Sequence, residues 1–166
     1  MGSHSHVTAI QFLRAPAGLA RSLFFPLRED LLLPEEGALL EARGELEAYF
    51  RGELTTFSTP LAPQGTPFQR KVWEALCSIP YGETTSYGEI ARRIDAPGAS
   101  RAVGAACRAN PVAIMIPCHR VVGKSGDLTG YAGGLLIKKF LLRLEQNRPG
   151  TVGNDGYRKK QRVQQL

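Results

Sequence analysis

The sequence predicts an α/β protein in which a small segment of strands and one helix precedes a mainly helical unit. Residues 7–27 hold two β-prone stretches around the turn sequence APAG. The following GALLEARGELEAYFRGEL has the composition and spacing of a helix, and helical patterns recur between residues 66 and 145. Two of these later helices are short and separated by a tight turn, an arrangement that resembles a helix-turn-helix.

A change in composition divides the chain into these two units. Residues 55–67, TTFSTPLAPQGTP, are rich in Thr and Pro and have no periodic apolar pattern. We therefore expect an N-terminal α/β domain over residues 7–60, a second domain over residues 64–147, and a basic, disordered tail over residues 148–166. The opening MGSHSH is more typical of a tag than of a folded element.

Capping signals place the helices of the second unit. Residues 66–69, TPFQ, combine a capping hydroxyl, a proline at the first helical position and a glutamine that reaches back, and predict a helix to about Ser78. Residues 86–89, SYGE, predict a second capping box and a short helix that DAPG ends. SRAVGAACRAN, residues 100–110, predicts a third helix, which Pro111 stops.

The net charge of +6 is unevenly distributed along the chain. Residues 1–65 carry five basic and eight acidic side chains, residues 66–145 eleven and six, and residues 146–166 five and one. A polyanion is expected to approach the later two thirds of the chain. No apolar run reaches the roughly 18 residues of a membrane span and the N-terminus does not resemble a secretory signal, so we expect an intracellular protein, cytoplasmic or, in a eukaryote, nuclear.

The chemical centre of the sequence is the pair Cys118 and His119. Residues 112–117, VAIMIP, predict a short buried strand that delivers the cysteine at its exit. A nearby histidine increases the thiolate fraction of a thiol, but adjacent residues point in different directions, so a turn or a bridging water is needed. The pair alone is equally compatible with a buried structural cysteine beside an incidental histidine. Three cysteines without a CxxC pair predict neither a disulfide framework nor a zinc site.

The third helix carries a second set of informative residues. Gly104, Ala105 and Ala106 make its middle narrow, so that its backbone can approach a groove or a neighbouring helix. Arg101 lies in its first turn, where a cation opposes the helix dipole. We infer that this arginine serves something outside the helix.

Six segments together resemble a known family. They are TPFQRKVWEAL, SYGEIA, RAVGAACRANPVAI, IPCHRVV, TGYAGG and LLRLE. In this order they are similar to the successive signatures of the O6-alkylguanine-DNA alkyltransferases. The resemblance covers roughly residues 66–145, about half of the chain, and the combination of PCHR with the upstream RAVG segment is its most specific part.

The resemblance implies stoichiometric, irreversible transfer of an alkyl group from O6-alkylguanine in DNA, with O4-alkylthymine as a further candidate substrate. It makes Cys118 the alkyl acceptor, His119 its water-relayed base, and Glu145 the carboxylate that orients the histidine. Asn110 would tie the third helix to the active-site strand. No cofactor and no metal are implied, and the N-terminal segment is expected to have a ribonuclease-H-like fold.

The same resemblance assigns the binding of base and DNA. Tyr87 assists rotation of the damaged nucleotide and Arg101 fills the space that it leaves, because a thiol cannot reach O6 inside a duplex. The candidate base-binding residues are Tyr87, Tyr131, Ala132, Val121 and Gly133, and the candidate DNA-binding residues are Arg101, Ala102, Gly104, Ala105 and Arg108. Ala132 departs from family members with serine there. The implied partner is double-stranded DNA, bound through its minor groove by a monomer, with no membrane partner.

Two other functions use overlapping residues. A Cys-His hydrolase would share the nucleophile and the base, but its acyl thioester is hydrolysed and the enzyme recycles, whereas an alkyl thioether has no carbonyl for water to attack. An alkyltransferase-like protein would bind lesions without repairing them. Such relatives replace the acceptor residue, whereas Cys118 stands in an intact PCHR segment.

Overall fold

The structure, a computed structural model, describes residues 6–10 and 37–147. Most of the two strands expected in residues 7–27, and the tail over residues 148–166, lie outside the described residues. The described part is a mixed α/β fold, mostly helical, with one small parallel sheet. None of its helices is long and apolar enough to cross a membrane.

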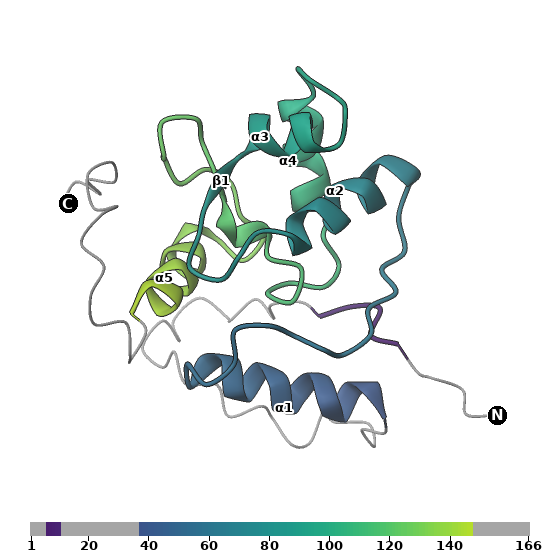
Figure 1. The fold of residues 1–166 in the computed structure, drawn as a ribbon, viewed down its shortest axis with the longest axis vertical. Coiled ribbons are helices and arrows are strands. Elements are labelled where there is room, and N and C mark those ends of the chain that lie inside the picture. Colours follow the sequence, from purple (N-terminus) through teal and green to yellow (C-terminus); the bar gives the residue numbers. More distant parts are fainter. Residues whose placement is uncertain (1–5, 11–36, 148–166) are drawn as a thin grey trace.

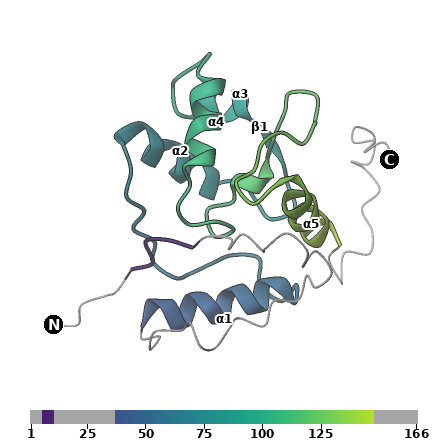
Figure 2. The same ribbon diagram turned by 180° about the vertical axis from the view of Figure 1, so that it is seen from behind.

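The helix α1 (Ala38–Phe50) confirms the helix expected in the first unit. Figure 1 shows α1 along one side of the molecule, apart from the group of α2, α3 and α4, and Figure 2 shows the same separation from behind. Ala38, Ala42 and Tyr49 form the buried face of α1. Because they recur at a helical spacing, one stripe of the helix faces the rest of the protein.

The helix α2 (Pro67–Cys77) starts as its capping signal predicts. The Gln69 backbone N–H donates to the Thr66 hydroxyl at 3.3 Å, and the Thr66 backbone N–H donates to the Gln69 side chain at 2.8 Å. The reciprocal pair satisfies two backbone donors that the first turn leaves open.

The expected capping box of α3 (Tyr87–Arg93) is only half formed. The Ser86 hydroxyl accepts a hydrogen bond from the Glu89 backbone N–H at 3.1 Å, as predicted. The Glu89 carboxylate, however, pairs with Arg92 and lies 3.8 Å from Arg93 instead of reaching back. The prediction of a full capping box fails because these charged neighbours one turn later bind a carboxylate more strongly than a backbone N–H does.

The helix α4 (Ser100–Arg108) completes a three-helix group with α2 and α3. Its core consists of apolar side chains from all three helices, chiefly Val72, Trp73, Leu76, Ile90, Ala91, Val103 and Ala106. The Trp73 indole N–H donates to the Ala106 carbonyl at 2.9 Å and so fixes α2 against α4.

The prediction of a strand over residues 112–117 is wrong. The segment folds into a tight buried loop, in which the Met115 N–H donates to the Ala113 carbonyl and the Ile116 N–H to the Val112 carbonyl, both at 3.0 Å. Ile114 has a φ of 73°, a left-handed conformation that branched residues rarely adopt. Val112 forms an isolated parallel bridge with Ile10, but no strand continues from it among the described residues, so most of the apolar run reflects burial of this loop.

A two-stranded parallel sheet connects the helical group to the segment after Cys118. β1 (Thr85–Ser86) pairs with β2 (Val121–Val122), with Thr85 opposite Val121 and Ser86 opposite Val122. The last described helix, α5 (Leu135–Gln146), packs against the turn between residues 117 and 121.

Candidate active site

Cys118 lies in a single 3-10 turn, Cys118–Arg120, and not at the end of a strand. The Arg120 N–H donates to the Pro117 carbonyl at 3.0 Å and the Cys118 N–H to the Ile116 carbonyl at 2.8 Å. The turn directs three consecutive polar side chains into the protein, and Cys118 is only 5% exposed. This meets the need for a turn at the Cys-His pair.

Asn110 connects the end of α4 to this turn. Its side-chain N–H groups donate to the Ile116 carbonyl at 2.9 Å and to the Cys118 sulfur at 3.2 Å, and its side-chain oxygen accepts from the Val112 N–H at 3.0 Å. The amide therefore fixes both the loop and the position of the sulfur. A donor aimed at sulfur favours the thiolate over the thiol.

The pKa of Cys118 nevertheless lies above its ordinary value, because burial disfavours the thiolate more than its neighbours favour it. The Asn110 hydrogen bond and the positive charge of Lys138 act in the opposite direction. The expectation that the nearby histidine increases the thiolate fraction of Cys118 is therefore wrong for the resting protein, since a neutral imidazole adds no positive charge. Activation must come from removal of the proton.

His119 is fully buried, and its ring lies within hydrogen-bonding distance of the Glu145 carboxylate. Its Nε2–H donates to the Glu145 Oε1 at 2.8 Å. Burial lowers the pKa of His119 even though Glu145 raises it, so the ring is neutral near neutral pH. With the proton on Nε2, Nδ1 is an acceptor, and it has no hydrogen-bond partner among the described residues. A neutral imidazole with a buried, open acceptor nitrogen is suited to act as a base.

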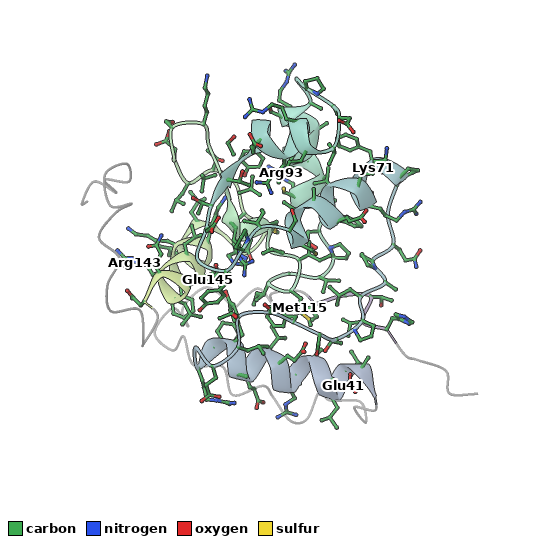
Figure 3. All side chains as sticks on the ribbon, in the orientation of Figure 1. Glu41, Lys71, Arg93, Met115, Arg143 and Glu145 are labelled. Atoms are coloured by element: carbon green, nitrogen blue, oxygen red, sulfur yellow. The ribbon has the colours of Figure 1, made fainter. Side chains whose placement is uncertain are left out.

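Glu145 is the centre of a polar cluster that we call the Glu145 cluster, made of Tyr49, Gly82, His119, Arg120 and Glu145. Figure 3 shows Glu145 on the side of α5 that faces the centre of the molecule and Arg143 on the opposite side. Arg120 binds both carboxylate oxygens, with its Nε 3.0 Å from Oε2 and its second terminal nitrogen 3.0 Å from Oε1. The Tyr49 hydroxyl donates to Oε1 at 2.8 Å and the Gly82 N–H to Oε2 at 3.1 Å.

These donors keep Glu145 ionised. Burial alone would raise its pKa, but the hydrogen bonds and charges of His119 and Arg120 overcome burial and lower the pKa to about 2. A fixed carboxylate at Nε2 holds the imidazole in one tautomer and stabilises it once it gains a proton.

The two candidate base-binding tyrosines lie near the thiol. Tyr87 is half-buried, and its hydroxyl donates to the Thr129 carbonyl at 3.3 Å. Tyr131 is also half-buried and packs against the apolar clusters on both sides of the turn. Burial raises the pKa of both phenols, and Cys118 contributes to each shift, so both hydroxyls stay protonated near the sulfur.

The remaining candidates divide between the protein interior and its surface. Val121 is buried, Gly133 is half-buried, and Ala132 is exposed. On α4, four of the candidate DNA-binding residues are exposed, namely Arg101, Ala102, Ala105 and Arg108. Gly104 is half-buried, and a side chain there would touch the Tyr87 ring at 3.8 Å. Of the small residues, Ala106 faces the core instead of the surface.

Residues 67–147 match the DNA binding domain of the 6-O-methylguanine DNA methyltransferases. The methylated-DNA–protein-cysteine methyltransferase of Methanosarcina mazei is 64% identical over 107 residues, which cover 64% of this chain and 68% of that protein. The relative of the same name from Mycobacterium leprae is 60% identical over 116 residues, covering 70% of each chain. The chain belongs to this methyltransferase family.

Solved structures of methyltransferases from Mycobacterium tuberculosis agree with this assignment. OGT in complex with DNA has a TM-score of 0.64 and 59% identity, covering 65% of this chain and 67% of that one. The structure of an OGT variant has a TM-score of 0.72 and 48% identity, covering 91% of this chain and 87% of that chain. The likeness therefore extends beyond the matched domain.

Three buried polar side chains lie in or next to the site but are not among the residues predicted from the methyltransferase signatures. Arg120 binds Glu145 and donates to the Ile79 carbonyl at 2.6 Å. Lys138 is fully buried and donates to the carbonyls of Val121 at 2.6 Å and Thr129 at 2.8 Å. Tyr49 approaches from α1. Arg120 had a signal as part of the IPCHRVV segment, and Lys138 had one because it shares the helical spacing of Leu141 and Glu145 on the apolar face of α5.

No group of three or more His, Cys, Asp or Glu side chains in the described part of this methyltransferase has an arrangement that holds a metal ion.

Proposed function

We propose that this protein repairs DNA by moving an alkyl group from O6-alkylguanine to its own Cys118, once per molecule. The observation that supports this most directly is the geometry around the sulfur. Asn110 holds Cys118 at 3.2 Å, in the same buried turn that presents His119 paired to Glu145. The relatives named methylated-DNA–protein-cysteine methyltransferase carry out the reaction that this arrangement suits.

The proposed chemistry begins with loss of the thiol proton. The Cys118 proton passes through a water molecule to the Nδ1 of His119, and Glu145 stabilises the resulting imidazolium. The sulfur then forms a bond to the alkyl carbon as the bond from that carbon to O6 breaks, and the electron pair stays with the guanine. The guanine regains a proton, for which the Tyr87 hydroxyl is the proposed donor, and Tyr87 is then reprotonated from solvent while His119 releases the Cys118 proton to solvent. The product thioether cannot be hydrolysed, so the protein is consumed.

DNA binding is proposed for the surface that α3 and α4 form as a helix-turn-helix. The exposed face of α4, with Arg101, Ala102, Ala105 and Arg108 and the narrow backbone at Gly104, would lie in the minor groove of double-stranded DNA. Arg101 would fill the space left by the flipped nucleotide. Phosphate contacts would supply most of the affinity, with little sequence readout.

The base pocket is proposed to lie between Tyr87, Tyr131 and Val121, with the backbone of Ala132 and Gly133 near O6. Ala132 has no hydroxyl to offer to O6, so bulkier alkyl groups should fit more easily than in relatives with serine. We further propose that the protein acts as a monomer, with a ribonuclease-H-like domain over residues 7–60, a catalytic domain over residues 64–147 and a basic tail over residues 148–166.

Intact mass spectrometry tests this function. The protein is incubated with excess duplex that contains one O6-methylguanine, and with the matched undamaged duplex as control. We expect each chain to exchange one proton for one methyl group, located on Cys118 by peptide mapping, only with the damaged duplex. Dealkylated product well beyond one per chain would show a recycling hydrolase, and binding without any change in mass would show a lesion-binding protein.

A further inference from the structure

Tyr49 brings the first part of the chain into the catalytic centre. It lies on α1, outside the matched residues 67–147, and its side chain is fully buried. Its hydroxyl donates to the Glu145 Oε1 at 2.8 Å, across 96 residues of sequence. A hydroxyl bonded to an ionised carboxylate in the protein interior is among the stronger hydrogen bonds of a protein.

The ring of Tyr49 is fixed on several sides. Its centroid lies 5.5 Å from that of Phe57 and 6.0 Å from that of Tyr81, the latter edge to face. Tyr49 also belongs to an apolar cluster with Ile114 and Leu141. Because this packing holds the ring, it also holds the hydroxyl oxygen beside the Glu145 carboxylate. Burial and the charge of Glu145 raise the pKa of Tyr49 far above its ordinary value, so the hydroxyl keeps its proton.

The Tyr49 hydroxyl shares its acceptor atom with His119. Both donate to the Glu145 Oε1 at 2.8 Å, to which Arg120 also donates at 3.0 Å, while Gly82 donates to the other oxygen. Each donor to a carboxylate oxygen withdraws negative charge from it, so the number of donors on Oε1 sets how strongly that atom binds the imidazole. Together with Arg120 and Gly82, the hydroxyl restrains the rotation of the carboxylate about its terminal bond.

We propose that Tyr49 is a positioning residue for the alkyl transfer, which orients Glu145 and thereby sets the basicity of His119. This inference rests on the proposed function, in which His119 accepts the Cys118 proton. Tyr49 acts through Glu145 and touches neither the sulfur nor the flipped base. The reactivity of the domain over residues 64–147 then depends on α1, so the first part of the chain tunes the chemistry in addition to completing the core.

The direction of the effect follows from the charges that face His119. Glu145 on α5 raises the pKa of His119, whereas Arg120 on the same turn and Lys138 on α5 lower it, together with burial. Tyr49 and Tyr131 also face Glu145, and Tyr81 lies beside Tyr49. Removal of the Tyr49 hydroxyl leaves the carboxylate charge less compensated, so the pKa of His119 should rise.

The test compares Tyr49→Phe, which removes the hydroxyl and keeps the ring, with Phe57→Leu, which loosens the packing of Tyr49 and keeps the hydroxyl. The single-turnover rate of methyl transfer is measured from about pH 5 to about pH 9, the range over which a histidine titrates. For Tyr49→Phe we expect the acid limb of the profile to move upward by about half a pH unit or more. The plateau rate should fall by about tenfold, the low end of what loss of an orienting partner costs a functional histidine. For Phe57→Leu the acid limb should stay in place, whatever the loss of thermal stability.

A second readout needs no DNA. The chain has three histidines, of which His4 and His6 lie near the N-terminus, so ¹⁵N NMR of the ring nitrogens isolates His119. Tyr49→Phe should raise the pKa of His119 in this titration, and Phe57→Leu should not. An unchanged His119 titration and pH profile in Tyr49→Phe, or the same shift in both variants, would overturn the proposal. A wild-type protein that accepts no methyl group while Tyr49→Phe still shifts His119 would instead refute the proposed function alone.

Discussion

The Glu145 cluster and the exposed face of α4 use polar residues in opposite ways. In the cluster, His119, Arg120 and Glu145 are at most 5% exposed and bind one another. On α4, Arg101 and Arg108 are exposed, and neither has a side-chain ion pair or hydrogen bond within the described part of the chain. The proposed chemistry thus uses side chains that are already paired within the protein, whereas the proposed DNA recognition uses arginines that have no such partner in the described part of the chain.

The two regions should therefore fail differently when one residue is changed. Removal of one member of a buried charged network leaves the others unpaired and affects folding together with chemistry. Removal of an exposed, unpaired cation affects only what binds there. Four variants examine this contrast, from the largest expected effect to the smallest.

Cys118→Ala should abolish methyl transfer while lesion-duplex binding stays within a few fold, since the thiol makes no phosphate contact. Intact mass and electrophoretic mobility shift measure the two properties. Cys77→Ala is the matched control, because Cys77 is exposed at the end of α2 and should leave transfer unchanged. A methyl group gained by the Cys118→Ala protein would refute the acceptor assignment.

Glu145→Gln should slow transfer at neutral pH by about tenfold or more, because the imidazolium loses its carboxylate. It should also destabilise the protein by about 3–5 kcal/mol, since Arg120 becomes a buried cation without a counter-charge. The rate should recover in part as the pH rises toward the titration of the thiol. Single-turnover kinetics and urea denaturation check both effects, and a wild-type rate at all pH values would show that His119 acts without the carboxylate.

The lowered pKa of Glu145 predicts how the stability of the wild-type protein depends on pH. Its pKa in the folded protein, about 2, lies below the ordinary 4.5. Folding therefore gains stability from Glu145 above about pH 4.5 and loses it as the pH falls toward 2. Urea denaturation over this range should show the decline in the wild type and a weaker one in Glu145→Gln. An equal decline of the free energy of unfolding in both proteins would show that other carboxylates cause the sensitivity to acid.

Arg101→Ala should slow repair of duplex DNA by about tenfold or more while transfer from free O6-benzylguanine changes little, because only the duplex reaction requires the vacated space to be filled. Arg108→Ala is the control on the same face, and should weaken binding to all DNA sequences. It should also reduce the slope of log affinity against log salt concentration by about one. Equal losses in both assays for Arg101→Ala would indicate a folding defect.

Ser86→Ala tests a local element between the two regions. Loss of the hydroxyl that caps α3 should cost about 1 kcal/mol and lower Tm by a few degrees. Glu89→Gln, which keeps the cap and weakens the exposed pairs with Arg92 and Arg93, should cost less. A larger loss of stability in Glu89→Gln than in Ser86→Ala would show that the carboxylate, and not the hydroxyl, is the main stabiliser of the start of α3.

Local signals in the sequence were sufficient for the helices. The Thr66 capping box, the cap at Ser86 and the stop at Pro111 act within a few residues, so their pattern predicts α2, α3 and α4. The loop over residues 112–117 could not be predicted, because its apolar composition is common to strands and buried loops and its turn depends on a left-handed Ile114.

For the site, the motifs identified Cys118, His119 and Glu145, but not what neutralises them. Arg120 and Lys138 act through contacts with groups 9 to 41 residues away, and Tyr49 through one with Glu145 on α5, 96 residues away. No spacing rule connects residues at such separations. The direction of the Cys118 pKa was missed for the same reason, since burial of the thiol is a property of the assembled core.

The smallest element of the fold links the two regions. β1 ends at Ser86, immediately before Tyr87, and β2 begins at Val121, immediately after the turn with Cys118. Four paired residues thus set the separation between the phenol proposed to hold the guanine and the sulfur proposed to attack its substituent. Because parallel pairing fixes this register, a slip of one residue would shift the two groups by about 3 Å, roughly the length of a reactive contact. The alignment of the two reacting groups therefore depends on backbone pairing, whichever side chains line the pocket.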